Sequence, residues 1–326
     1  MELLTELRAA VEEQAKKYKH SELKKAAVAI RERYLEEGGT GKKLLTKDVE
    51  AVAYSLTRMP ATFGAVSSAL SYTLPGMYQS KQKELEKFSL LDVGAGCGAA
   101  SWALSALLPL RSVTCLERER AMRDLGRTFM QEGPDVLKNA RWLDADLLRE
   151  QLERHDVVVA SYVVNELAQE DRAEVLQNLW EHAGQLLLLV EPGTPAGFAV
   201  IKEARELLLG MGAHIAAPCP HENACRLKED DWCHFTCRIA RSRLHRELKD
   251  GDAPYEDEKF TYLAITRQET NPVFTARILR HPYVEKGRVT LELCTREENK
   301  TLRVTKRDAG LFKKARKAKC GDGLIL

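Results

Sequence analysis

The amino-acid sequence predicts an α/β fold built around a parallel sheet. Between residues 88 and 190, short apolar runs alternate with segments of helical periodicity, a pattern typical of parallel strands joined by crossover helices. A glycine-rich turn follows the first of these runs, and a cysteine-rich stretch follows the last. We therefore expect four regions: a helical region over 1–79, a doubly wound domain over 80–210, a Cys-rich module over 211–254, and a β-rich region with a basic tail over 255–326.

The composition is that of an ordinary globular chain. Its 326 residues, 44% of them hydrophobic, suffice for one large core and an appended module. The start of the chain lacks the pattern of an export signal, and no apolar run approaches the roughly 18 residues of a membrane span. We expect a soluble, cytoplasmic protein with no membrane partner, whose eight cysteines are thiols or metal ligands rather than disulfides.

Helical periodicity dominates the first region. Apolar residues recur at helical spacing up to residue 34, and the glycines of 38–41 then interrupt the period. A second helical stretch covers 46–70, in which Pro60 should end one helix and Thr62 should help to start the next.

The second region should supply the parallel strands and their crossover helices. The expected strands are 88–93, 112–116, 140–143, 156–160 and 185–190, and the segments 99–108 and 171–183 have the periodicity and length of crossover helices.

The glycine-rich turn, residues 92–98, has the sequence Asp-Val-Gly-Ala-Gly-Cys-Gly. Glycine lets the backbone turn sharply and approach a ligand closely. The spacing Gly-x-Gly-x-Gly after an aspartate differs from the dinucleotide fingerprint Gly-x-Gly-x-x-Gly and is usual in enzymes that use S-adenosylmethionine. We therefore predict an S-adenosylmethionine site in a Rossmann-like methyltransferase domain, with Asp92, Gly94, Gly96 and Gly98 as cofactor-binding residues.

Acidic residues follow the next two expected strands. Glu117 comes 21 residues after Gly96, where a carboxylate can accept hydrogen bonds from ribose hydroxyls. Asp144 and Asp146 are candidates to bind the adenine amino group. The alternative for each is a solvated loop carboxylate.

Polar residues also follow the expected strand 156–160. Ligands of this fold lie beyond the carboxyl ends of the strands, so Ser161, Tyr162, Asn165 and Glu166 should face the methyl group. Asn165 and Glu166 are the candidates for a catalytic role, that of orienting an acceptor base. A structural cap on the following helix is the alternative.

Three cysteines fall within fifteen residues, at 219, 225 and 233, and a fourth follows at 294. The spacing is not that of a zinc finger, but four thiolates can hold either zinc or a [4Fe–4S] cluster. Neighbouring prolines and aromatic residues should limit the access of solvent. We predict metal ligands among these residues, with His221, His234 and Cys237 as alternatives, whereas Cys97, Cys115 and Cys320 should be inert buried thiols.

The last region should be rich in strands, at 260–266, 274–280, 289–294 and 302–305, and it ends in a basic tail. A basic helix is expected over 238–249. Its arginines and the tail's cations can neutralise the phosphates of an RNA, although a solvated helix face is the alternative. The candidate RNA-binding residues are Arg238, Arg241, Arg243, Arg246, Lys313, Lys314, Arg316 and Lys317.

From about residue 50 to its end, the chain resembles the small-ribosomal-subunit assembly methyltransferase family that includes mitochondrial methyltransferase-like protein seventeen. The resemblance is carried by 58–62 (Arg-Met-Pro-Ala-Thr), 90–98 with Trp102, 219–221 (Cys-Pro-His), 231–235 (Asp-Trp-Cys-His-Phe) and 286–295 (Lys-Gly-Arg-Val-Thr-Leu-Glu-Leu-Cys-Thr). The chain departs from the family where Cys97 replaces a usual proline and Cys320 replaces a common aromatic residue.

The resemblance implies a class I methyltransferase fold, S-adenosylmethionine as cofactor, and a [4Fe–4S] cluster on Cys219, Cys225, Cys233 and Cys294. From the residues alone, zinc stays the alternative. The resemblance also implies the small ribosomal subunit and its rRNA as partners, and we expect a monomer off the ribosome. The expected function is that of a subunit assembly factor or an rRNA methyltransferase. A non-catalytic RNA-binding assembly factor and a zinc-stabilised small-molecule methyltransferase are the alternatives.

Overall fold

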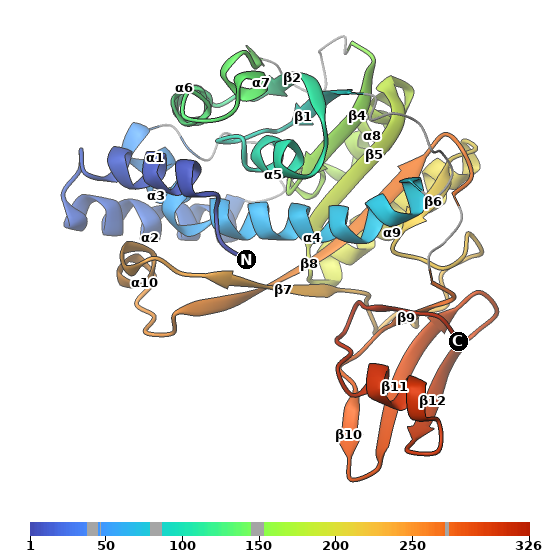
Figure 1. Cartoon of the computed structure of the whole chain (residues 1–326). Coiled ribbons are helices and arrows are strands. Elements are labelled where there is room, and N and C mark those ends of the chain that lie inside the picture. The colour runs from blue at the N-terminus through green and yellow to red at the C-terminus, as the bar shows by residue number, and fades with distance from the viewer. Residues whose placement is uncertain (38–44, 46, 79–86, 145–152, 271–273) are drawn as a thin grey trace.

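The computed structural model describes residues 1–37, 45, 47–78, 87–144, 153–270 and 274–326. Within them the chain forms an eight-stranded sheet with helices on both faces and a separate five-stranded sheet near the C-terminus. Figure 1 shows the smaller sheet below one end of the larger one.

Four helices precede the first strand: α1 (Thr5–Ala15), α2 (His20–Glu37), α3 (Asp48–Thr57) and α4 (Met59–Tyr78). The break expected around Pro60 exists, but α4 begins at Met59 rather than at Thr62. Pro60 lies in the first turn of α4, where a missing N–H leaves no hydrogen bond unmade. The long α4 packs on α5, β7 and β8, across one face of the larger sheet (Figure 1).

Five parallel strands form the first part of the larger sheet, as predicted: β1 (Phe88–Val93), β2 (Leu110–Leu116), β3 (Arg141–Leu143), β4 (His155–Ser161) and β5 (Ala183–Pro192). The segments between and after them form α5 (Ala99–Leu107), α6 (Arg120–Met130), α7 (Asp135–Lys138), η1 (Val164–Glu166), α8 (Gln169–His182) and α9 (Pro195–Gly210). The strand order β3-β2-β1-β4-β5 reverses between β1 and β4. In such sheets ligands bind at this switch point.

The larger sheet continues beyond residue 210, the predicted end of the doubly wound domain. β8 (Tyr255–Thr266) lies antiparallel between β5 and β6 (His214–Ala217), and β7 (Phe235–Ala240) pairs with its first half. The apolar end of β8 is buried throughout, because it is flanked by a strand on each side. The order β3-β2-β1-β4-β5-β8-β6, with one antiparallel strand inserted, is the class I methyltransferase fold.

The helix expected over 238–249 is only partly present. Residues up to Ala240 belong to β7, and α10 covers only Arg243–Leu248. Pairing of β7 with β8 overrides the helical spacing of the arginines in this stretch.

The smaller sheet contains β10 (Tyr283–Glu285), β11 (Arg288–Thr295), β12 (Asn299–Thr305), β9 (Ala276–Ile278) and β13 (Gly323–Leu324), and confirms the strand-rich C-terminal part. α11 (Ala309–Ala315) packs on β11 and β12 over a core of its own. Two further apolar clusters lie on opposite faces of the larger sheet, as the alternation of Leu90 and Leu91 between them illustrates. No helix in the described ranges has the length and apolar character needed to cross a membrane.

Candidate cofactor loop and cysteine cavity

The glycine loop leaves β1 at the switch point of the sheet. Gly94, Gly96 and Gly98 have φ values of 63°, 56° and 84°, which non-glycine residues rarely adopt. A β-carbon added at Gly94 would lie 2.6 Å from Val163 Cγ2, whereas one at Gly96 would meet only Met122 Cε, at 3.3 Å. The loop is therefore packed against the protein at Gly94 and more open at Gly96.

Asp92 joins this loop to the following helix. Its Oδ2 accepts hydrogen bonds from the Ser101 amide (2.9 Å) and hydroxyl (2.7 Å) in the first turn of α5. Burial raises the pKa of Asp92 to about 7. Its Oδ1 is buried without a hydrogen-bond partner.

Glu117 links the loop to the end of β2. Its Oε2 accepts from the Gly96 amide (2.8 Å) and its Oε1 from the Glu119 amide (2.7 Å), and burial raises its pKa. Asp144, after β3, accepts from Arg123 Nη2 at 2.9 Å, and its side chain is 68% exposed. Asp146 lies outside the described residues.

The predicted catalytic residues line a cavity of about 1070 Å³ at the ends of β4 and β5, which α2 and α3 also line. Asn165 and Glu166 both face it, and Asn165 Oδ1 is buried without a partner. Burial raises the pKa of Glu166 to about 7. The glycine loop does not line this cavity.

Tyr162 lines this cavity, and Glu191 holds the backbone of Asn165 beside it. Tyr162 has φ 59°, an uncommon conformation for a tyrosine, and its hydroxyl donates to Glu258 Oε1 at 3.0 Å. Glu191 Oε1 accepts from the amides of Val164 (3.0 Å) and Asn165 (3.3 Å), and burial raises the pKa of Glu191 to about 8. Glu191 ends a buried strand, where a lone carboxyl is unusual, but it was not among the predicted site residues.

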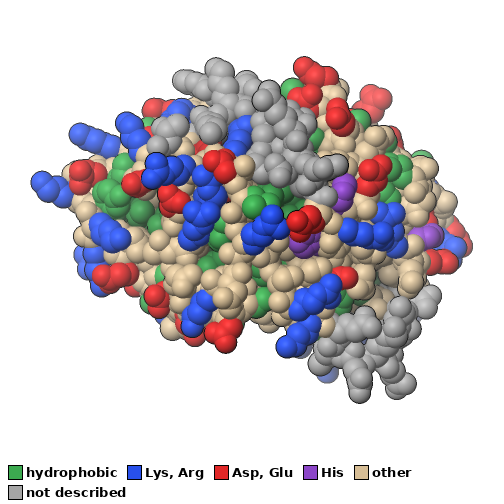
Figure 2. All heavy atoms as spheres, turned by 90° about the horizontal axis from the view of Figure 1, so that it is seen from above, with side chains coloured by type: hydrophobic (Ala, Val, Ile, Leu, Met, Phe, Trp, Pro, Cys, Tyr) green, Lys and Arg blue, Asp and Glu red, His purple; other side chains and the backbone are tan. Residues whose placement is uncertain are grey.

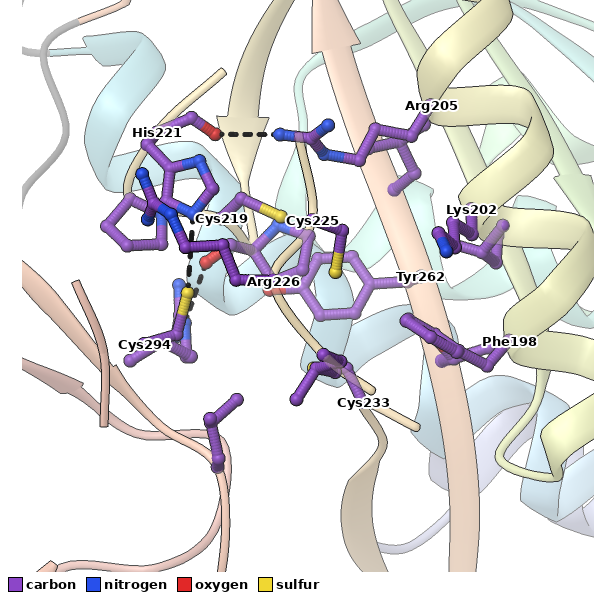
Figure 3. Close-up of a pocket in the computed structure, with 18 of the residues that line it drawn as sticks. Phe198, Lys202, Arg205, Cys219, His221, Cys225, Arg226, Cys233, Tyr262 and Cys294 are labelled. Atoms are coloured by element: carbon purple, nitrogen blue, oxygen red, sulfur yellow. Dashed lines mark hydrogen bonds between the residues drawn. The ribbon is translucent and has the colours of Figure 1, made fainter. Parts of the chain in front are cut away.

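The four predicted metal ligands lie around a second cavity, of about 50 Å³ (Figure 3). Cys219, Cys225 and Cys233 come from the connection between β6 and β7, and Cys294 comes from β11 of the smaller sheet. The long gap in sequence before Cys294 is thus closed in space. The cavity lies where the two sheets meet.

The alternative ligands divide into two groups. His221 lines the cavity, with its Nε2 3.5 Å from Cys294 Sγ, whereas His234 and Cys237 are not in the lining. His234 stacks on Trp232 instead. Cys97, Cys115 and Cys320 are buried outside the lining, and Cys320 Sγ lies 3.3 Å from the Leu279 carbonyl.

The cysteines of the cavity lie in buried, largely apolar surroundings. Burial raises the pKa of Cys219, Cys233 and Cys294, that of Cys294 to about 12. Prolines 218 and 220 and Leu279 form part of an apolar wall. In the described part of the chain, no three His, Cys, Asp or Glu side chains are close enough together to hold a single metal ion.

The basic segments 238–249 and 313–317 differ in how many of their cations form ion pairs. Arg238, Arg241 and Arg243 form ion pairs with Asp257, Glu256 and Glu247 at 2.6–2.8 Å, and Arg246 Nε is buried without a partner. The tail cations Lys313, Lys314, Arg316 and Lys317, in and just after α11, are exposed and form no ion pair with a described acidic residue. Of these two segments, the tail therefore carries the exposed cations without a described ion pair.

Curated proteins match most of this chain. It is 26% identical over 293 residues to the human protein "Ribosome assembly protein METTL17, mitochondrial", a match that covers 83% of this chain and 62% of that protein. It is 22% identical over 334 residues to "Rsm22-cox11 tandem protein 2, mitochondrial" of Schizosaccharomyces pombe, covering 84% and 43%. The chain therefore spans less than two thirds of the length of these relatives.

Solved structures show more distant likeness. Magnesium protoporphyrin IX methyltransferase from Synechocystis, solved with bound SAM, has a TM-score of 0.43 and 15% identity, covering 74% of this chain and 97% of that one. The ribosomal protein L11 methylase of Lactobacillus delbrueckii has a TM-score of 0.35 and 14% identity, covering 62% and 79%. The model of the family described as "Mitochondrial small ribosomal subunit Rsm22" matches residues 48–325, and the chain belongs to this family.

Proposed function

We propose that this protein is an assembly factor of the small ribosomal subunit that binds S-adenosylmethionine and holds a metal group on four cysteines. The observation that carries the proposal is the family match over residues 48–325, which includes both the glycine loop and all four cysteines. The name of the family refers to the small ribosomal subunit, and that of the human relative to ribosome assembly.

The glycine loop supports the cofactor. It follows β1 at the switch point of a class I methyltransferase sheet, where this fold binds its ligand. The buried Asp92 Oδ1 lacks a donor, and the ammonium group of S-adenosylmethionine is a donor of the kind it needs. Glu117 and Asp144 stay our candidates for the ribose and the adenine.

The convergence of Cys219, Cys225, Cys233 and Cys294 on one cavity supports the metal group. A bound group would tie the β6–β7 connection to β11 and so join the two sheets. The thiols surround the cavity but do not form a single-ion site, and a [4Fe–4S] cluster spans more space than one zinc ion. We therefore favour the cluster over zinc.

The exposed tail cations support contact with rRNA. Figure 2 shows lysine and arginine side chains interspersed with acidic ones on the face it displays, rather than one continuous basic patch. Lys313, Lys314, Arg316 and Lys317 are our candidates for phosphate contacts, because they are exposed and form no ion pair with a described acidic residue, whereas the arginines of 238–243 are paired.

Methyl transfer to an rRNA base is the second candidate function. The large cavity beside Asn165 and Glu166 has room for a nucleobase, and Tyr54 and Tyr162 in its lining offer aromatic rings. In the non-catalytic alternative, the same fold only shapes an RNA-binding surface. We keep a cytoplasmic location as a prediction, while the names of the curated relatives place them in mitochondria.

Sedimentation with purified small ribosomal subunits tests the proposal. We expect wild-type protein to co-sediment, and Lys313→Glu with Lys314→Glu to weaken binding and flatten its salt dependence by about 0.9 in logarithmic slope for each lost phosphate contact, the value for duplex nucleic acid. The matched control is Arg238→Glu with Arg243→Glu, which should change the slope less because these arginines are already paired. Wild-type protein that never sediments with subunits contradicts the ribosomal function and favours a small-molecule enzyme.

A further inference from the structure

Two buried arginines line the cysteine cavity. Arg205 on α9 is 4% exposed and Arg277 on β9 is 2% exposed. The two arginines come from different parts of the fold. α9 packs on the larger sheet, and β9 belongs to the smaller one. Neither forms an ion pair with a carboxylate of the described residues, whereas most buried charges are paired.

Arg205 holds the segment between the first two cysteines. Its Nη2 donates to the carbonyls of His221 (3.1 Å) and Asn223 (2.6 Å). Figure 3 shows the side chain extending from α9 toward His221, beside Cys219. Its Nε is buried and has no acceptor.

Arg277 holds the residue before the first cysteine. Its Nε donates to the Pro218 carbonyl (2.8 Å) and its Nη1 to the Gly321 carbonyl (2.7 Å), and the guanidinium lies 3.8 Å from the centre of the Phe274 ring. Its Nη2 is buried and has no acceptor. Tyr262, whose hydroxyl is also buried and unpartnered, lines the same cavity.

These donors need a negatively charged group. A buried cation without a counter-charge is strongly unfavourable, and so is a buried N–H without an acceptor. A divalent metal core held by four thiolates keeps two negative charges, whether it is zinc or an oxidised [4Fe–4S] cluster. Two guanidinium groups balance that charge. The side-chain oxygen of Asn299 is also buried without a partner in this lining. Because an amide can be turned by 180°, Asn299 can direct its NH₂ group into the cavity in place of the oxygen.

We infer that Arg205 and Arg277 are the counter-charges and positioning residues of the metal group. Each fixes the backbone beside a cysteine through carbonyls and offers its remaining N–H to a thiolate or sulfide sulfur. The inference rests on the proposed metal centre. It adds the residues whose positive charge offsets the unfavourable burial of four thiolates. Arg226 also lines the cavity but donates to the Thr295 and Arg296 carbonyls at 3.2–3.4 Å and is less buried.

The test is the rate at which anaerobically purified protein releases its metal to EDTA, followed by absorbance and metal analysis. We expect Arg205→Met and Arg277→Met to release metal roughly ten- to a hundredfold faster than wild type, as is usual when partners of metal ligands are removed. Arg205→Lys and Arg277→Lys restore the charge but not the fork of donors, so their rates should lie between those of wild type and the Met variants.

Arg267→Met is the matched control. Arg267 also donates to backbone carbonyls and stacks 4.0 Å above a ring, that of Trp180, but it lies outside the cavity. We expect it to release metal at the wild-type rate. If Arg277→Met does not fold, Arg205→Met and the two Lys variants decide the matter.

The outcomes separate the two proposals. Wild-type protein that carries no metal overturns the metal centre and this inference together. Metal-loaded wild-type protein whose Met variants release metal at the wild-type rate overturns this inference alone. Lys variants as fast as the Met variants also overturn it, because the carbonyl contacts rather than the charge would then account for the effect.

Discussion

Two regions of the molecule differ in which buried polar atoms lack partners. The cofactor side comprises the glycine loop and the ends of β1, β4 and β5, and the cysteine side is the cavity around the four cysteines. On the cofactor side the unpartnered buried atoms are mainly acceptors, such as Asp92 Oδ1 and Glu191 Oε2, with the indole N–H of Trp102 as the exception. At the cysteine cavity they are mainly donors, on Arg205, Arg277 and Tyr262. The first arrangement suits a ligand that carries donors and positive charge, and the second suits an anionic group.

The two sides also differ in whether their buried charged groups can become neutral without a ligand. The buried carboxyls of the cofactor side can keep their protons, because burial raises the pKa of Asp92 to about 7 and of Glu191 to about 8. An arginine cannot lose its charge in this way. We therefore expect the glycine loop to be stable without a ligand, and the cysteine cavity to depend on the proposed metal group.

The largest effect should come from Cys233→Ser. We expect loss of the metal and a fall of several kcal/mol in unfolding free energy, part of the roughly 10 kcal/mol that a structural metal contributes. Metal analysis and thermal unfolding measure both quantities. Cys115→Ser, a buried control with its Sγ 3.5 Å from Ser101 Oγ, should keep the full metal content. If the Cys233→Ser protein had wild-type metal content and stability, the cysteine cavity would not depend on a metal held by Cys233.

Substitutions in the glycine loop should separate folding from ligand binding. Gly94→Ala forces a β-carbon against Val163 at positive φ, so we expect a loss of about 1–3 kcal/mol in stability. The β-carbon of Gly96→Arg is also at positive φ but meets only the methyl of Met122, so this variant should abolish S-adenosylmethionine binding with less effect on folding than Gly94→Ala. Calorimetry and thermal unfolding test the pair, and unchanged affinity in Gly96→Arg would place the cofactor elsewhere.

A pH dependence should belong to the cofactor side. The pKa of Glu191 is raised in the folded state, so its contribution to stability is fully present below about pH 4 and is lost as the pH rises through about 8. Glu191→Gln keeps the acceptor for the Val164 and Asn165 amides but cannot ionise. We expect its stability to fall less than that of wild type between pH 6 and 9, by on the order of 2 kcal/mol. Urea unfolding at each pH measures this difference. If the unfolding free energies of wild type and Glu191→Gln changed equally with pH, Glu191 would not be the source of the pH dependence.

The smallest effect on stability should come from Asp144→Asn. The carboxylate pairs with Arg123 at 2.9 Å but is 68% exposed, so its loss should cost less than about 1 kcal/mol. If Asp144 binds the adenine amino group, cofactor affinity should nevertheless fall. An unchanged dissociation constant in calorimetry would leave Asp144 with only its ion pair.

Local signals explain which parts of the fold were predictable. β1 has the predicted bounds because an apolar run ends at a glycine turn, and both signals lie within a few residues. The place of β8 between β5 and β6 was not predictable, because its neighbours are distant in sequence and only burial on both faces fixes its position. The same pairing turned part of a predicted basic helix into β7.

The cysteine cavity shows a similar limit. The cysteines were visible as a set, but the arginines that face them were not. Arg277 gave one usable signal, a single cation between the apolar Ala276 and Ile278 of a short strand. Arg205 gave none, because an arginine on a helix of mixed character is ordinary. Only their burial beside the cavity distinguishes them.

Hydrogen exchange tests the central claim most directly, because it compares both sides in one molecule. The amides of metal-loaded protein would be compared with those of reduced, EDTA-treated protein. We predict that metal removal abolishes protection in 218–233 and 288–295 and leaves 88–107, which includes β1, the glycine loop and α5, unchanged. Equal protection of 218–233 with and without metal, or an equal loss in 88–107, would contradict the account.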